Sequence, residues 1–189
     1  ERGEATRGGA PPWRPYAAML GLFVLALLSK SVTCTLPVAL LLMLLWQRRR
    51  ITSRHVTLLL PLLLLGLLCA WNTARLERVH VGAAGPEFEF SLAERALIAT
   101  RALLFYPGKL LLPWPLVFIY PRWELEATRA ASYGPLLLEL AVAAAAVAAW
   151  RRGGRGPALA LAFYPVTIAP ALGFVDVYPM RYSFVADHF

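Results

Sequence analysis

The sequence has 189 residues, of which 59% are hydrophobic and 16% are charged. Together with a mean hydropathy of +0.58, these shares exclude an ordinary soluble domain and indicate an integral membrane protein. The net charge of +8 is in the range of nucleic-acid-binding proteins, but the arginines lie in short clusters between apolar runs, so we expect no nucleic-acid partner.

The first apolar stretch, residues 13–46, predicts two membrane crossings rather than one. A single straight helix over this stretch would be about 50 Å long, whereas the hydrocarbon core of a bilayer is about 30 Å thick. The polar run from Ser29 to Thr35, followed by Pro37, is typical of a turn between two helices. We therefore predict crossings near 13–30 and 31–46.

Residues 56–72 predict a third crossing, and the region after them predicts none. Residues 73–134 are mixed in charge and interrupted by five prolines, which is typical of an external interfacial region. Within it, residues 92–104 predict a helix at the membrane surface, because charged residues are costly in a lipid-exposed span. Residues 105–123, rich in proline, tryptophan and tyrosine, predict a segment at headgroup depth that lies at the surface or dips in and returns.

Two further apolar runs, residues 135–150 and 157–175, predict the last two crossings. Arginine clusters precede the first crossing, follow the second and separate the last two, and short cytoplasmic loops collect arginine. Two crossings within residues 13–46 place all three clusters on the cytoplasmic side, whereas one crossing would separate the first two. The sequence thus predicts an all-α, polytopic transmembrane helical bundle with about five crossings and an interfacial or re-entrant segment.

Charged side chains on the predicted external side are the candidates for chemistry. Lys30 is flanked by serine and threonine hydroxyls between two helices. Such an ammonium suits a lipid-linked phosphate, and anchoring of a helix end at the membrane surface is the alternative role. The closing segment supplies carboxylates and aromatic rings that suit a sugar or an acceptor, with a solvated loop as the alternative. The candidate donor-phosphate ligands are Lys30, Arg101, Lys109 and Arg181, and the candidate catalytic residue, which would orient an acceptor hydroxyl, is Asp187.

Motifs for several other kinds of site do not occur in the sequence. There is no Walker or Rossmann glycine pattern, no Cys/His metal spacing and no G-x-S-x-G nucleophile motif. The three histidines are far apart, and the two cysteines lie in apolar runs, where a thiol behaves as a small hydrophobe. We therefore expect no cofactor, no metal and no disulfide.

Three segments, in chain order, resemble a known family: ALLSKSVTCTLPVALLLMLLW, RALLFYPGKLLLPWPLVFIYPRW and AFYPVTIAPALGFVDVYPMRYSFVADHF. They are similar to the membrane part of bacterial tetratricopeptide-repeat proteins related to the transmembrane and tetratricopeptide-repeat O-mannosyltransferases. The likeness covers most of the chain and rests on short motifs. The family's closing block commonly reads Ala-acid-Arg-Tyr, whereas this chain has Ala186-Asp187-His188-Phe189, so a permanent cation and its bidentate fork are missing.

The resemblance implies a GT-C type glycosyltransferase fold that moves a sugar from a polyprenyl-phosphate donor to a protein or glycan acceptor on the non-cytoplasmic side. It implies a multi-pass protein of the bacterial cytoplasmic (inner) membrane, in contact with membrane lipid, with tetratricopeptide repeats beyond residue 189. In this family the catalytic acid usually lies in the first external loop. The chain begins without methionine and ends after a charged and aromatic cluster, so we expect a fragment that lacks that loop.

Two other functions are open from the sequence. A non-catalytic membrane scaffold that presents tetratricopeptide repeats for protein contacts is the main alternative to an enzyme. A transporter or flippase is less favoured, because the sequence shows no paired half-segments with interrupted helices.

Overall fold

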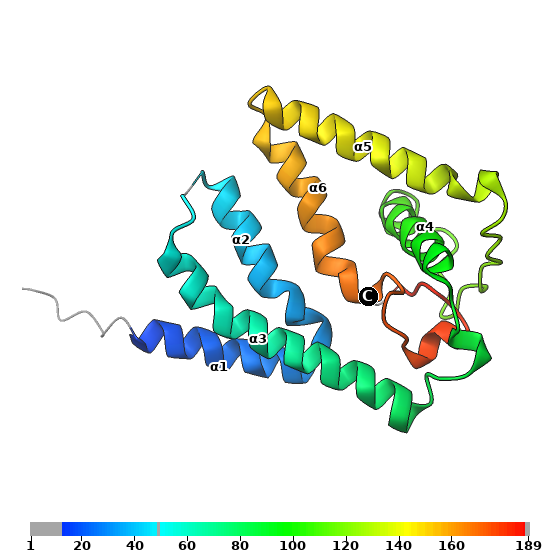
Figure 1. Ribbon diagram of the computed structural model, residues 1–189, viewed down its shortest axis with the longest axis horizontal. Helices are drawn as coiled ribbons and strands as arrows, with labels where there is room; N and C mark the ends of the chain where they lie inside the picture. The colour runs from blue at the N-terminus through cyan, green and yellow to red at the C-terminus, as the bar shows by residue number, and fades with distance from the viewer. Residues whose placement is uncertain (1–12, 49, 188–189) are drawn as a thin grey trace, which may run out of the picture.

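All regular secondary structure is helical in the residues that the computed structural model describes, 13–48 and 50–187 (Figure 1). This confirms the expected all-α class. The six α-helices are α1 (Trp13–Ser29), α2 (Leu36–Trp46), α3 (Ser53–Leu76), α4 (Leu92–Leu111), α5 (Gly134–Arg151) and α6 (Arg155–Ile168). The shorter turns are the π-helical η2 (Glu77–Val81) and the 3₁₀ turns η1 (Ser31–Thr35), η3 (Pro86–Phe88), η4 (Ala130–Tyr133), η5 (Ala169–Ala171) and η6 (Tyr178–Arg181). The arginines before Trp13, together with Arg49 and His188, lie outside the described residues.

The chain turns between α1 and α2, within the polar run. Lys30 has an extended backbone, with φ −150° and ψ 112°, so α1 ends at Ser29. The 3₁₀ turn η1 then leads into α2, and Pro37 lies in its first turn, where the missing N–H is not needed.

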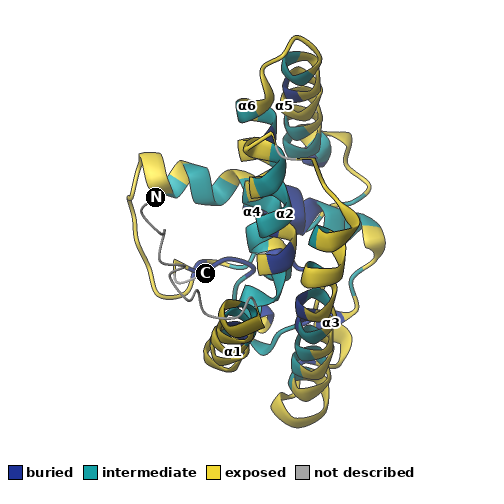
Figure 2. Cartoon of the chain, turned by 90° about the vertical axis from the view of Figure 1, so that its left-hand side faces the viewer, coloured by how far each residue is buried: buried dark blue, intermediate teal, exposed yellow. Residues whose placement is uncertain are grey.

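Two helices among the described residues are long and apolar enough to cross a membrane, by length and composition. They cover residues 53–81, which are α3 and η2, and residues 130–151, which are η4 and α5. The helices α1, α2 and α6 have 17, 11 and 14 residues, fewer than the roughly 20 of a straight crossing. Most side chains of α3 and α5 are exposed (Figure 2), so the apolar surface of these helices is left for other molecules to cover. Helix length thus identifies two of the five expected crossings.

The helix ends form two groups in Figure 1. The α2–α3 and α5–α6 connections lie toward the upper left, whereas the α1–α2 turn, the end of α3 and the C-terminal segment lie toward the lower right. The arginine-rich residues 48–54 and 151–155 belong to the first group, and Lys30 belongs to the second. The helices α2, α3 and α6 therefore run between these two ends of the molecule.

Close contacts join α3 to α1 and to the turn η1. Phe23 and Leu27 of α1 bury their side chains against Leu62 of α3. One turn further along α3, a Cβ on Gly66 would lie 2.8 Å from the carbonyl oxygen of Cys34. A glycine is therefore needed for this approach of backbone to backbone. On the other side of η1, α6 packs between α2 and α5.

The helix α4 runs across the other helices. It is seen nearly end-on in Figure 1 and lengthwise in Figure 2. It begins with a capping box, in which the Glu94 N–H donates to the Ser91 hydroxyl at 3.3 Å and the Ser91 N–H donates to Glu94 Oε2 at 2.7 Å. It continues past the expected end at residue 104 to Leu111, and the chain is irregular from residue 112 to 129. No continuous helix therefore covers residues 105–123.

The end of α4 and the residues after it present apolar side chains to the surroundings. Leu110, Leu111, Trp114 and Phe118 are 83%, 87%, 78% and 88% exposed. Within this stretch the Trp114–Pro115 peptide bond is cis. The apolar surface of this segment lies beside, rather than within, the core of the described chain.

After α6 the chain bends back against α4 instead of continuing as a helix through residue 175. Gly173 has a φ of +85°, a conformation that favours glycine, and a Cβ there would lie 2.7 Å from Cγ2 of Ile98. The returning segment buries Met180 and Phe184 against Ile98 and Phe88. Residues 172–187 are thus held on the same end of the molecule as α4.

Candidate functional site

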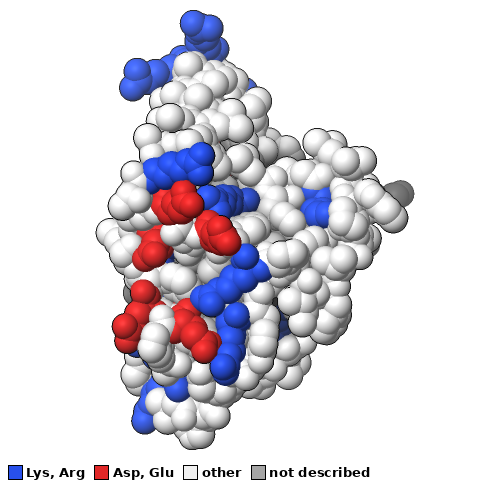
Figure 3. All heavy atoms as spheres, turned by 90° about the vertical axis from the view of Figure 1, so that its right-hand side faces the viewer, with Lys and Arg blue, Asp and Glu red and all other residues white. Residues whose placement is uncertain are grey.

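Acidic and basic side chains intermingle on the face of the molecule at the right of Figure 1, which Figure 3 shows. Within the described residues, every aspartate and glutamate except Glu139 lies in 77–134 or 176–187. The arginine-rich helix connections at the other end contain no acidic residue among those described. The charge pattern therefore separates the two ends of the bundle.

Lys30 lines a cavity of about 170 Å³ between η1, α3 and the C-terminal segment. The other polar side chains in its lining are the hydroxyls of Ser31, Thr73 and Ser183 and the thiol of Cys34, and the remaining walls are mostly apolar. The turn residues of η1 bring Lys30 to this wall because α1 stops one residue before it. A cation at the edge of an apolar cavity suits an anionic group attached to a hydrocarbon.

Lys109 and Asp187 both contact Tyr120. The Tyr120 hydroxyl donates to the Asp187 carboxylate, whose oxygens lie 2.9 and 3.0 Å away. The Lys109 ammonium lies 5.0 Å from the centre of the Tyr120 ring and donates to the carbonyl of Pro115. The Asp187 side chain is itself at the surface. This arrangement holds a carboxylate in place and leaves it accessible to an acceptor.

The Tyr120 phenol is a stable donor in this arrangement. Burial, followed by the hydrogen bond with Asp187, raises the pKa of Tyr120 above its usual value of 10.0. The phenol therefore stays protonated at neutral pH and keeps its hydrogen for the carboxylate. This hydrogen bond orients the Asp187 carboxylate, so Tyr120 acts as a positioning residue.

The other two predicted ligands have different partners. Arg101 donates to the backbone carbonyl of Glu124 at 2.9 Å. Arg181 forms an ion pair with Glu87 at 2.9 Å, with both side chains nearly half exposed. The five predicted site residues thus do not form one cluster: Lys109 and Asp187 meet at Tyr120, Lys30 lines the cavity, and the two arginines hold nearby loops.

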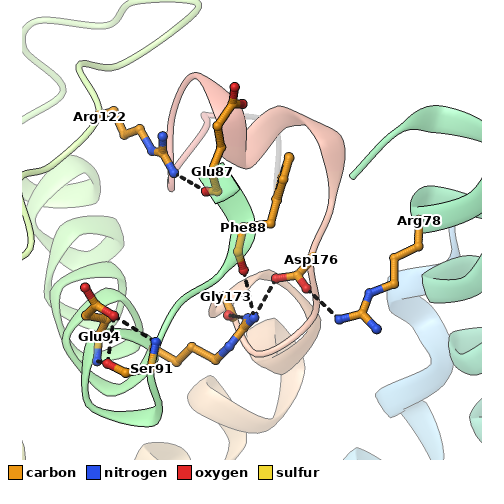
Figure 4. A network of polar contacts seen from close by, with 9 residues as sticks. Arg78, Glu87, Phe88, Ser91, Glu94, Arg122, Gly173 and Asp176 are labelled. Carbon is orange, nitrogen blue, oxygen red and sulfur yellow. Dashed lines mark hydrogen bonds and ion pairs between the residues drawn. The ribbon is translucent and has the colours of Figure 1, made fainter. Parts of the chain in front are cut away.

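A polar network that the sequence did not predict is centred on Asp176 (Figure 4). Its carboxylate is 4% exposed and pairs with Arg95 of α4 at 2.8 Å and with Arg78 of η2 at 2.9 Å. Arg95 also donates to the carbonyls of Gly173 at 2.9 Å and Phe88 at 3.3 Å. The network therefore ties α3, α4 and the C-terminal segment together.

No local signal in the sequence identifies this network. Arg78 and Asp176 are 98 positions apart, and Arg95 lies in a stretch whose charges the sequence assigns to the membrane surface. Only the fold brings the three side chains together. The apolar neighbours of Asp176 indicate only that its carboxylate has some partner, because a carboxylate in such a stretch is usually paired.

Among the described residues, no group of three or more His, Cys, Asp or Glu side chains is placed to hold a metal ion. The site therefore consists of one apolar cavity with a lysine, one positioned carboxylate and one buried ion-pair network.

Comparisons of the chain with protein-family models, with curated proteins and with solved structures found no match.

Proposed function

We propose that this chain is part of the membrane domain of a glycosyltransferase-like protein of the bacterial cytoplasmic membrane. It moves a sugar from a polyprenyl-phosphate donor to a protein or glycan acceptor on the non-cytoplasmic side. The resemblance of its three segments to the membrane part of tetratricopeptide-repeat O-mannosyltransferases motivates this assignment. Tetratricopeptide repeats after residue 189 belong to the same proposal.

The observation that carries the proposal is the position of Lys30 at the wall of an apolar cavity. A polyprenyl phosphate has a hydrocarbon tail and an anionic head, and this cavity offers surfaces for both. The ammonium and the adjacent Ser31 hydroxyl would bind phosphate oxygens, and the apolar walls would bind the first isoprene units. Lys30 is therefore assigned as the donor-phosphate ligand.

The acceptor role is assigned to Asp187. Its carboxylate is accessible and is oriented by the Tyr120 hydroxyl. A carboxylate held in this way can accept the hydrogen of an acceptor hydroxyl and fix its direction. Lys109, over the Tyr120 ring, adds a positive charge to this part of the site.

The membrane arrangement extends this proposal. The helices α3 and α5 cross the bilayer, and the shorter α1, α2 and α6 complete five crossings, with Trp13, Trp46 and Trp150 near their ends at headgroup depth. The helix α4, which runs across the other helices, lies at the external membrane surface. The apolar residues 110–119 dip into that surface. The arginine-rich connections are then cytoplasmic, and the cavity of Lys30 is external.

The test is sugar transfer from a polyprenyl-phosphate donor by the full-length protein. Lys30→Ala should weaken donor use by roughly ten- to a hundred-and-fifty-fold, because loss of a charge-assisted contact costs about 1.5–3 kcal/mol. Lys30→Arg should restore only part of this loss, since a planar fork does not replace a compact ammonium. Arg14→Ala, at the other end of α1, is the matched control and should leave donor use unchanged.

Asp187→Asn should lower turnover and leave donor affinity nearly unchanged. Tyr120→Phe should lower turnover less, because the carboxylate remains and only its orientation is lost. Wild-type transfer with an equally active Lys30→Ala variant would refute the assignment of Lys30. If the wild-type protein transfers no sugar, the scaffold function is favoured instead.

A further inference from the structure

A second cavity, of about 560 Å³, lies between the end of α3 and the C-terminal segment. Its lining contains three arginines, Arg75, Arg78 and Arg95, and one carboxylate, Asp176. Its apolar walls include the rings of Trp71 and Phe174. Three guanidinium groups face one carboxylate, so the lining carries a positive excess.

The carboxylate in the lining is already occupied. Asp176 is buried and pairs with Arg95 at 2.8 Å and with Arg78 at 2.9 Å (Figure 4). The Arg95 guanidinium is mostly buried and also donates to two backbone carbonyls. Arg95 and Asp176 therefore form the buried base of the cavity, and one nitrogen of Arg78 is bound to Asp176.

The two remaining cationic groups are exposed. Arg75 lies at the end of α3 and Arg78 in the π-helical turn η2 that follows, and both line this cavity. The Arg75 guanidinium lies 5.9 Å from the centre of the Trp71 ring, one turn earlier. Two guanidinium groups beside an aromatic ring can bind an anion and contact the group that carries it.

We propose that this cavity binds a phosphate group, with Arg75 and Arg78 on its oxygens and with Trp71 and Phe174 against the remainder of the ligand. Phosphate fits better than a carboxylate, because its three terminal oxygens can accept hydrogen bonds from two guanidinium groups at once. The cavity lies at the end of a helix that is long and apolar enough to cross a membrane. The end of such a helix lies at the depth of the lipid headgroups. The proposal does not depend on sugar transfer.

The test is calorimetric titration of the full-length protein in detergent micelles. One arm uses inorganic pyrophosphate, and the other uses a short-chain phosphatidic acid below its micellar concentration. Binding in the first arm assigns a soluble phosphate ligand, binding in the second assigns a lipid headgroup, and either result supports the proposal. Arg75→Gln should weaken the binding about tenfold, and it leaves both ion pairs of Asp176 in place.

The double variant Arg75→Gln/Arg78→Gln should weaken the binding further. Its charge-matched control is Arg151→Gln/Arg152→Gln, which removes two exposed arginines beside a tryptophan at the end of α5. This control should bind as the wild type does, and near-ultraviolet circular dichroism should show that all variants are folded. The proposal is overturned if neither ligand binds to the wild type, or if the Arg75 variants and the control bind equally.

Discussion

Replacing Asp176 by asparagine tests whether the buried ion pairs hold the C-terminal segment on α4. Asparagine keeps the size of the side chain and removes its charge. Arg95 would then lose its partner in a site where the two side chains are 16% and 4% exposed. Removing one partner of a buried pair costs about 3–5 kcal/mol, and the two carbonyls that Arg95 keeps favour the lower end of that range.

The pair with Arg78 should contribute less. The Arg78 side chain is 65% exposed, so solvent screens the interaction and its loss should cost about 0–1 kcal/mol. Asp176→Asn should therefore destabilise the protein by about 3–4 kcal/mol in total, which corresponds to a fall in melting temperature of about 10 °C for a chain of this size.

The measurement is thermal unfolding in detergent micelles, followed by near-ultraviolet circular dichroism. Arg95→Gln should be nearly as destabilising as Asp176→Asn, and Arg78→Gln should be almost neutral. The double variant of positions 95 and 176 should cost less than the sum of the single changes, because the two side chains interact directly. A loss below about 1 kcal/mol for Asp176→Asn, or a larger loss for Arg78→Gln than for Arg95→Gln, would refute this reasoning.

Three further predictions follow from local geometry. Gly66→Ala should destabilise the protein by about 1–3 kcal/mol, because its Cβ would meet the Cys34 carbonyl oxygen at 2.8 Å; Gly21→Ala, with no atom within 4 Å, should be neutral or stabilising in the same unfolding assay. Hydrogen bonds from the N-cap serine lower the pKa of Glu94 below 4.5, so its contribution to stability should be full above pH 4.5 and lost as the pH falls through the lowered value. Glu94→Gln should remove that acid-dependent part of the melting temperature, and an unchanged pH profile would contradict the cap's role. An environment-sensitive dye at Phe118→Cys, in a background without the native cysteines, should report an apolar surrounding in lipid nanodiscs, and a fully aqueous spectrum would exclude membrane contact there.

The sequence was sufficient to predict the elements that depend on local pattern. The polar run before Pro37 predicts the end of α1, because Lys30 and its neighbours interrupt the apolar stretch. Apolar length predicts the helices α3 and α5, and the Ser91 to Glu94 spacing fits the start of α4. These signals lie within a few residues of the structure that they determine.

The rest depends on contacts between distant positions. The apolar run 157–175 reads as one helix, but α6 ends at Ile168 and Gly173 directs the chain back against α4. Tyr120 and Asp187 are 67 positions apart, so no local pattern shows that the tyrosine orients the carboxylate. The partners of Asp176, Arg78 and Arg95, cannot be identified from the sequence either, because charged residues of this kind are also typical of a solvated loop.

The bend at Gly173 also has a mechanical consequence. The carbonyl of Gly173 accepts a hydrogen bond from Arg95, and its α-carbon faces Ile98 without room for a side chain. Gly173, which follows α6 and the turn η5, therefore contacts α4 through both its carbonyl oxygen and its α-carbon. In the five-crossing arrangement that we propose, a thinner bilayer that tilts α6 should also move α4, so that the depth of the apolar end of α4 depends on the thickness of the membrane.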